Sequence, residues 1–317
     1  MRRMLVVIAV VMLLPQPASA DVAIQAYALP SAGGYPHDVA VGSDGIVWYT
    51  AQPTGQLGRL DPATGKVDLI PLGKGAAPHG VVIGPDGAPW ITEGGTNAIV
   101  RVDPQTSRVK RFPLRTSNAN LNTAAFDGNG ILWFTGQAGI YGKLDPRTGI
   151  VTTYDARRGR GPYGIDADPS GVAWYSSLAG SYLARIRSAD GRATVFDIPT
   201  DGGGGRRVWS DSTGKLWVTE WFAGKLARFD PGTSRWREWN LPGSTPQPYA
   251  VFVDDRDIVW VTDFGSNSLL RFDPTTERFR SFNFPSAGAE VRQLLGRPGE
   301  VWGAESGTDK LVVLRTS

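Results

Sequence analysis

The sequence contains no cysteine, and this absence excludes two ways of stabilising or anchoring a protein. No disulfide can form, and no lipid can be attached through a cysteine, so the chain must be held together by its core. Histidine is nearly absent as well, because only His37 and His79 occur among 317 residues. Any reaction that needs an imidazole base has only these two to use.

An excess of charge of one sign is also missing, since 33 Lys and Arg face 30 Asp and Glu. Two of the basic residues, Arg2 and Arg3, lie in the apparent leader described below, so the remaining chain has 31 basic and 30 acidic residues. No cluster of Lys and Arg interleaved with aromatic residues occurs. We therefore expect no nucleic-acid partner.

The chain has no hydrophobic run long enough to span a bilayer. The longest, Leu5 to Leu14, is about half of the roughly 20 residues that a spanning helix needs. It follows the basic pair Arg2-Arg3 and precedes Ala18-Ser19-Ala20, which has the small residues of a cleavage site. Residues 1–20 are predicted to be a signal peptide, which implies a secreted or periplasmic protein with no membrane attachment after cleavage.

Glycine and proline are abundant, with 40 and 23 copies, and they punctuate the chain at regular intervals. Seven tryptophans recur in one local context, each followed by an aromatic, aliphatic or small residue and most then by Thr or Ser. Their successive spacings are 42, 43, 41, 43, 43 and 42 residues. The seven are Trp48, Trp90, Trp133, Trp174, Trp217, Trp260 and Trp302.

Each repeat of about 42 residues is predicted to hold four short strands, which is typical of a propeller blade. In the second copy the strands are expected at 79–83, 89–92, 99–102 and 109–114. The last copy has only three strands, and residues 24–30 are expected to supply the fourth and so to close the ring. The predicted fold is an all-β, seven-bladed propeller that forms a single domain over residues 21–317, with the tryptophans between the blades.

Two sets of equivalent positions are predicted to meet at one end of the central channel, and both vary chemically from copy to copy. A polar funnel of this kind is where a small-molecule or peptidic ligand would bind, and its acids could hold a divalent cation. The Asp-Pro turns are expected at the opposite end. The first set is His37, His79, Asn122, Tyr163, Arg207, Tyr249 and Arg292, and the second includes Glu93, Glu220, Asp263 and Glu305.

Three motifs in the second copy resemble the repeat of the virginiamycin B lyase (streptogramin lyase) family. They are Pro78-His79-Gly80, Gly84-Pro85-Asp86-Gly87 and Trp90-Ile91-Thr92-Glu93. The resemblance extends over the whole chain after the leader. It implies a lyase that opens a cyclic depsipeptide by elimination, with a His as general base and a Mg²⁺ held by acids.

The chain departs from that family at the residues that would carry the reaction. The family's Glu-Pro-His-Gly motif corresponds to Glu290-Val291-Arg292-Gln293, so Arg292 takes the place of the base, and Arg does not accept a proton at neutral pH. The two acids have counterparts in Glu290 and Glu305. Tyr249 replaces the family's substrate-binding His, which leaves His79 with Glu93 as a substitute pair in another blade.

Three functions are therefore consistent with the sequence. The first is a Mg²⁺-dependent lyase, with His79 and Arg292 at the catalytic positions and Glu290, Glu305, Glu93, Glu220 and Asp263 as metal ligands. The second is a non-catalytic propeller that binds a ligand or a protein, and the third is a lactone hydrolase like the gluconolactonase propellers. In each case we expect a monomer.

Overall fold

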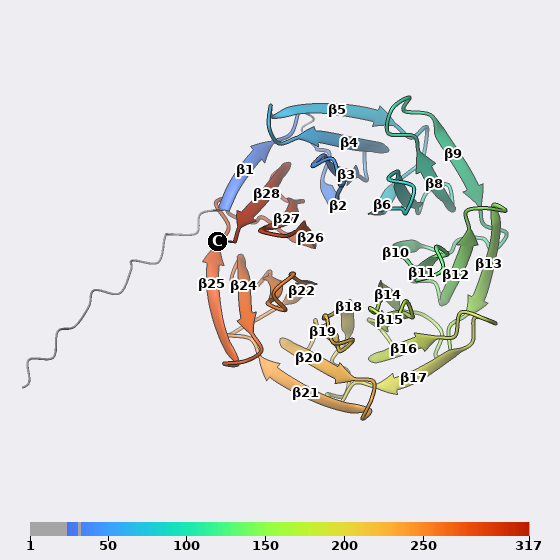
Figure 1. Ribbon diagram of the computed structural model, residues 1–317. Helices are drawn as coiled ribbons and strands as arrows, with labels where there is room; N and C mark the ends of the chain where they lie inside the picture. The colour runs from blue at the N-terminus through green and yellow to red at the C-terminus, as the bar shows by residue number, and fades with distance from the viewer. Residues whose placement is uncertain (1–23, 31–32, 317) are drawn as a thin grey trace, which may run out of the picture.

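The computed structural model describes residues 24–30 and 33–316. The signal peptide predicted for residues 1–20 lies outside these ranges. The described residues form seven four-stranded antiparallel sheets arranged as a ring, as Figure 1 shows. The fold prediction is confirmed. No helix long and apolar enough to cross a membrane occurs in the described part of the chain.

In six blades the four strands follow one another from the channel outward, and the seventh is completed by the N-terminal strand. The innermost strands are β2 (Pro36–Val41), β6 (Pro78–Ile83), β10 (Leu121–Phe126), β14 (Pro162–Ala167), β18 (Gly205–Ser210), β22 (Pro248–Val253) and β26 (Val291–Arg297). The second strands are β3 (Val47–Ala51), β7 (Pro89–Glu93), β11 (Leu132–Gly136), β15 (Ala173–Ser177), β19 (Leu216–Glu220), β23 (Val259–Asp263) and β27 (Glu300–Glu305). The third strands are β4 (Gln56–Asp61), β8 (Ala98–Val102), β12 (Ile140–Asp145), β16 (Tyr182–Ile186), β20 (Lys225–Asp230), β24 (Ser268–Asp273) and β28 (Lys310–Arg315). The outermost strands are β5 (Lys66–Pro71), β9 (Val109–Pro113), β13 (Ile150–Asp155), β17 (Ala193–Asp197), β21 (Arg235–Asn240), β25 (Arg278–Asn283) and β1 (Ile24–Ala28).

The ring closes as the sequence predicts. Strand β1 pairs antiparallel with β28, from Ile24 opposite Leu314 to Ala28 opposite Lys310. Tyr27 stacks on Trp302 of the same blade, with ring centroids 5.5 Å apart. The N-terminal strand thus covers the edge of the last blade, which would otherwise be free to pair with another chain.

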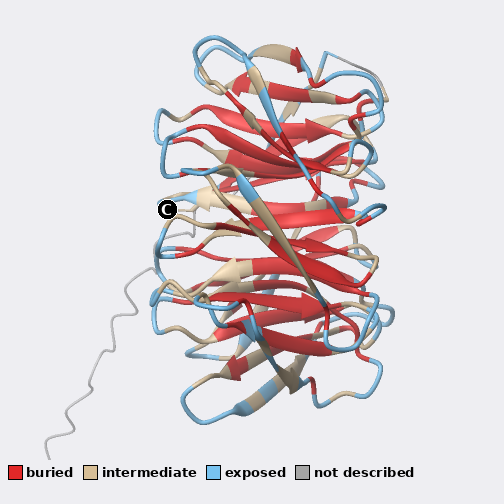
Figure 2. Cartoon of the chain, turned by 90° about the vertical axis from the view of Figure 1, so that its right-hand side faces the viewer, coloured by how far each residue is buried: buried red, intermediate tan, exposed pale blue. Residues whose placement is uncertain are grey.

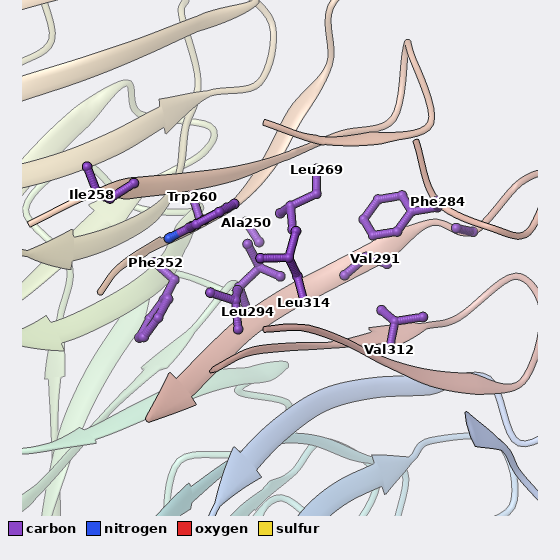
Figure 3. Packing of buried hydrophobic residues seen from close by; sticks show 12 residues of the cluster. Ala250, Phe252, Ile258, Trp260, Leu269, Phe284, Val291, Leu294, Val312 and Leu314 are labelled. Carbon is purple, nitrogen blue, oxygen red and sulfur yellow. The ribbon is translucent and has the colours of Figure 1, made fainter. Parts of the chain in front are cut away.

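The seven repeat tryptophans are buried, with at most 2% of their surface exposed. Each packs among apolar residues between blades, as Trp260 does in Figure 3 beside Phe252 and Leu294. In six blades an acid in or near the turn before the second strand accepts a hydrogen bond from the indole nitrogen, as Asp127 does from Trp133 at 2.9 Å. The strands are mostly buried, whereas the exposed residues lie in loops and outer strands (Figure 2).

Every innermost strand carries a β-bulge near its start. The register shifts between its first residue and its fourth, so that the second and third residues together face one residue of the neighbouring strand. In β2 the amide of Asp38 donates to Thr50 Oγ1 at 3.1 Å. Thr50 in turn donates to the main-chain oxygen of His79 in the next blade at 2.6 Å. The Thr of the repeated motif therefore fixes the bulge and joins adjacent blades, and bulges of this kind re-aim side chains at functional sites.

Candidate functional site

The bulges place two layers of residues at one end of the channel. The second residues of the innermost strands form the outer layer, and the third residues form the inner layer. The outer layer is His37, His79, Asn122, Tyr163, Arg206, Tyr249 and Arg292. The inner layer is Asp38, Gly80, Thr123, Gly164, Arg207, Ala250 and Gln293. The assignment of Arg207 to the outer layer is wrong by one residue, because Gly205 pairs with Glu220 and the equivalent residue is Arg206.

An ion pair crosses the channel within the inner layer. Arg207 Nη2 donates to Asp38 Oδ1 at 2.9 Å, although the two residues belong to the fifth and the first blade. Both side chains are buried, with 3% and 2% of their surface exposed. Burial raises the pKa of Asp38, even though the charge of Arg207 opposes that shift. Arg207 is therefore held across the channel by Asp38 through one of its terminal nitrogens.

The two histidines lie beside this pair. His37 Nδ1 is 2.8 Å from the same Asp38 oxygen, and the His37 and His79 rings are 3.9 Å apart between centroids. Burial, followed by the charges of Arg207, Arg292 and Arg206, lowers the pKa of His37 well below its ordinary value. Burial, and then His37, also lowers the pKa of His79. Both imidazoles are neutral at physiological pH.

Asn122 fixes the ring of His79 by a contact of 3.2 Å between Asn122 Nδ2 and His79 Nε2. The other ring nitrogen, His79 Nδ1, is buried and has no hydrogen-bond partner among the described residues, and neither does Asn122 Oδ1. Both residues are buried. This side of the channel mouth thus offers neutral polar atoms to a ligand.

On the other side of the mouth, arginine lies on aromatic rings. The guanidinium of Arg206 is 3.6 Å from the Tyr249 centroid and 4.2 Å from the Trp221 centroid. Tyr249 and Tyr163 share a hydrogen bond of 2.5 Å between their hydroxyls. Burial alone would raise the pKa of Tyr249, but the charges of Arg206 and Arg207 outweigh it, so that the pKa is lowered. Arg206 Nε is buried and has no partner among the described residues.

Arg292 lies at the rim of this aromatic side. Its guanidinium is 5.9 Å from the Tyr249 centroid and 5.8 Å from the Phe264 centroid. Arg292 Nη2 donates to Glu290 Oε2 at 2.5 Å. Arg292 and Glu290 thus form an ion pair at this rim.

The acids that end the second strands lie at the same end of the blades but are held within their own blade. Glu93 contacts Thr96 of the following turn and Arg111 of the outermost strand, and Glu305 contacts Thr308. Glu93 pairs with Pro78 in the sheet. The expected pairing of Glu93 with His79 is therefore wrong.

Asp263 is bound in the same way, whereas both side-chain oxygens of Glu220 are buried and have no hydrogen-bond partner among the described residues. Asp263 accepts hydrogen bonds from the amides of Gln247, at 2.6 Å, and Gly265, at 3.1 Å. Burial, and then the neighbouring Glu238, raises the pKa of Glu220 to about 8, so Glu220 is a neutral acid at pH 7. Asp263 thus stabilises the turn that follows its strand. Among the described residues, the four acids do not converge as a group in the channel.

The described residues do not fit a Mg²⁺ site. Mg²⁺ requires an octahedral set of oxygen ligands. Glu290 and Glu305 lie in the seventh blade, whereas Glu93, Glu220 and Asp263 lie in three other blades, and among the described residues no three of these acids bring their ligand atoms together. Of the described residues, the one group of metal-ligand types that converges is His37, Asp38 and His79, whose ligand atoms lie within 4.8 Å of one another. Two nitrogens and one oxygen suit zinc-like metals better than Mg²⁺. Arg207 already occupies the Asp38 carboxylate.

Sequence reasoning missed Asp38 and Arg206. A signal for Asp38 was present, because Asp38 occupies the position at which the second and fourth copies have Gly80 and Gly164. The signal for Arg206 was the pair Arg206-Arg207, but the position of the bulge is needed to decide which of the two belongs to the outer layer.

Comparison with known proteins agrees with the fold. The model of the virginiamycin B lyase family matches residues 18–181 and 149–314. A search of curated proteins gave no match.

Among solved structures, the virginiamycin B lyase of Staphylococcus aureus is similar with a TM-score of 0.88 at 22% identity, over 94% of this chain and 100% of that chain. A streptogramin B lyase is similar with a TM-score of 0.86 at 22% identity, over 93% and 98%. The extracellular domain of a one-component system protein from B. thetaiotaomicron has a TM-score of 0.72 at 17% identity, over 92% of this chain and 42% of that chain.

Proposed function

Since the chain belongs to the virginiamycin B lyase family, we propose that it is an exported propeller that binds a small or peptidic ligand without cleaving it. The ligand occupies the channel mouth between the two histidines and the arginine-aromatic side, and an anionic group of the ligand pairs with Arg206. The predicted signal peptide supports export. The likeness to a bacterial extracellular domain agrees with that location.

Arg206 is the residue that carries this proposal. Its guanidinium is already oriented by Tyr249 and Trp221, at 3.6 and 4.2 Å, yet its Nε has no partner among the described residues. An oriented guanidinium that keeps a free N–H binds a carboxylate or phosphate with little entropic cost. No described acid neutralises Arg206, whereas Arg207 and Arg292 each have one.

The aromatic rings around Arg206 supply the apolar part of the site. Tyr249 stacks on Phe264 with centroids 5.0 Å apart, and Trp221 meets both rings edge-on at 5.6 and 5.5 Å. Flat aromatic surfaces beside a cation favour ligands that have both a ring and a negative charge. A peptide with an aromatic residue and a free carboxylate has this chemistry.

A binding experiment tests the role of Arg206. Isothermal titration calorimetry compares N-acetylphenylalanine with its uncharged amide, using the parent protein and the Arg206→Met variant. Arg228 provides a matched control, because its guanidinium also lies over two tryptophans, at 5.5 and 5.7 Å, but in the third strand of the same blade. We expect the carboxylate to bind at least about tenfold more tightly than the amide, which corresponds to ~1.4 kcal/mol. Arg206→Met should abolish this preference and Arg228→Met should preserve it. Equal binding of both compounds by the parent would overturn the proposal.

Lyase activity is the second candidate function, and the surroundings of His37 favour it. Its contact with Asp38 resembles the orientation of a general base by a carboxylate, and its lowered pKa keeps the imidazole neutral. Against it, Arg292 occupies the family's base position and cannot accept a proton.

Mass spectrometry of a streptogramin B-type cyclic depsipeptide separates the possible reactions. Elimination opens the ring without a change in mass, and lactone hydrolysis adds one water. We expect neither product. A ring-opened product of unchanged mass that disappears in His37→Ala would establish the lyase, and a product heavier by one water would establish the hydrolase.

A further inference from the structure

A cavity lies in the half of the channel beyond the inner layer, toward the ends at which the innermost strands finish. Its volume is about 320 Å³. The wall is mainly apolar and includes Val82, Ala125, Trp209 and Leu295. This volume is at the lower end of the range for small-molecule sites.

Polar atoms of the inner layer form the floor of this cavity. Asp38, Thr123, Arg207 and Gln293 all line it, whereas no residue of the outer layer does. Arg207 Nε and Gln293 Oε1 are both buried and have no hydrogen-bond partner among the described residues. A buried polar atom without a partner has lost its hydrogen bonds to water, so a ligand group that pairs with it gains free energy on binding. Arg207 Nε can only donate, and Gln293 Oε1 can only accept.

The charges around the floor favour an uncharged ligand. Arg207 is paired with Asp38, so the floor carries no net charge. Asp166 also lines the cavity, and its carboxylate already accepts hydrogen bonds from the amide and the hydroxyl of Ser210, at 2.7 and 3.0 Å. An anion would lie close to these two acids, whereas a cation would lie close to Arg207. A group that is neutral and can both accept and donate a hydrogen bond satisfies Arg207 Nε and Gln293 Oε1 together.

We propose that this cavity is a second binding site, which takes a small uncharged carboxamide attached to an apolar body. The amide oxygen accepts from Arg207 Nε, the amide N–H donates to Gln293 Oε1, and the apolar body packs against Trp209 and Leu295. The site is independent of the function proposed for the opposite mouth, because Arg206 and the rest of the outer layer do not line it.

Three probes of similar size test the chemistry of the site. Benzamide has the proposed group, benzoate replaces it with a charge, and toluene has neither. By calorimetry or ligand-observed NMR, the parent protein should bind benzamide with a dissociation constant of roughly 1 mM or below. Benzoate could also bind at Arg206 in the opposite mouth, so the three probes and the variants below are compared in the Arg206→Met background. There, benzoate and toluene should bind at least about tenfold more weakly than benzamide.

Two variants place the binding in the cavity. Gln293→Leu removes the acceptor and should abolish the preference for benzamide over toluene. Ala125→Leu fills the cavity from a half-buried position of its wall and should abolish binding of all three probes. Arg228→Met, in the third strand of the fifth blade and outside the cavity wall, serves as the control and should leave benzamide binding unchanged. No binding of benzamide, equal binding of benzoate, or binding that survives Ala125→Leu in a variant that melts like the parent would overturn the proposal.

Discussion

Breaking the ion pair across the channel should have unequal effects depending on which partner is replaced. Asp38→Asn leaves the buried guanidinium of Arg207 without an anion, and Arg cannot lose its proton. Arg207→Gln leaves a buried carboxylate, but Asp38 can become neutral by binding a proton, because burial already raises its pKa. The variant that keeps Arg207 should therefore be the less stable one.

The magnitude follows from the burial of both groups, which expose only 3% and 2% of their side chains. Removing one partner of a buried pair costs about 3–5 kcal/mol, so we expect Asp38→Asn to lose that amount of unfolding free energy at pH 7. Arg207→Gln should lose about 2–3 kcal/mol, because the remaining acid protonates. The double variant should be more stable than the sum of the single losses predicts, by about 2 kcal/mol or more.

Urea unfolding followed by tryptophan fluorescence measures these four free energies. The pair Arg59 and Asp68 serves as the control, because it is also an ion pair between strands but its side chains are 35% and 41% exposed. Its coupling should stay below about 1 kcal/mol. Additive losses at Asp38 and Arg207, or a larger loss for Arg207→Gln than for Asp38→Asn, would refute the reasoning.

Three further predictions concern closure, pH and metal. Truncation before residue 33 removes β1 and so exposes the edge of β28 and the face of Trp302 that Tyr27 covers. We expect the melting temperature to fall by about 5 °C or more, and an unchanged melting temperature would contradict the role of β1 in closing the ring. The pKa values of His37 and His79 are lowered in the folded state, so only the unfolded chain gains their protons as pH falls through 6.5. His79→Gln should therefore reduce the loss of unfolding free energy by up to ~1.4 kcal/mol per pH unit, a slope that is approached about one unit below pH 6.5. An unchanged slope in urea titrations would show that His79 is protonated in the folded protein. Mg²⁺ should give no heat in calorimetry. Zn²⁺ should bind the Arg207→Gln variant at least about tenfold more tightly than the parent, because the substitution frees the Asp38 carboxylate and removes a positive charge beside it. Equal Zn²⁺ affinities would exclude a metal site at the two histidines.

The fold could be predicted from the sequence because its determinants repeat. Each tryptophan is buried between blades, and acids in or near the preceding turns bind six of the seven indole nitrogens. The predicted strand at 109–114 is observed at Val109–Pro113, and the predicted closing strand at 24–30 is observed at Ile24–Ala28. Such features recur seven times, so an error in one copy is corrected by the others.

The site could be predicted only in part, because the bulge breaks the alternation on which strand reasoning depends. With one extra residue in each innermost strand, neighbours such as Arg206 and Arg207 occupy adjacent layers of the channel. The contacts of the acids that end the second strands could not be predicted for a related reason. Glu93 ends its strand, and its contacts with Thr96 and Arg111 within its own blade depend on turn geometry that the residue order does not reveal.

The bulge also explains how the channel mouth can vary while the ring stays intact. Thr50 binds the main-chain oxygen of His79, not its side chain, and Thr92 does the same to Asn122 in the next blade. The identity of an outer-layer side chain is thus separated from the contact that joins the blades.

Some positions of the inner layer, in contrast, do not allow a side chain. A Cβ on Gly80 would lie 2.8 Å from the main-chain oxygen of Asn122, and a Cβ on Gly164 would lie 2.7 Å from the Cα of Arg207. In the first and fifth blades the inner layer instead carries Asp38 and Arg207, which meet across the channel. Their ion pair holds the only carboxylate that lies beside the two histidines among the described residues. Because Arg207 already binds the Asp38 carboxylate, that carboxylate is not free to bind a metal. This favours ligand binding over metal-assisted catalysis at the channel mouth.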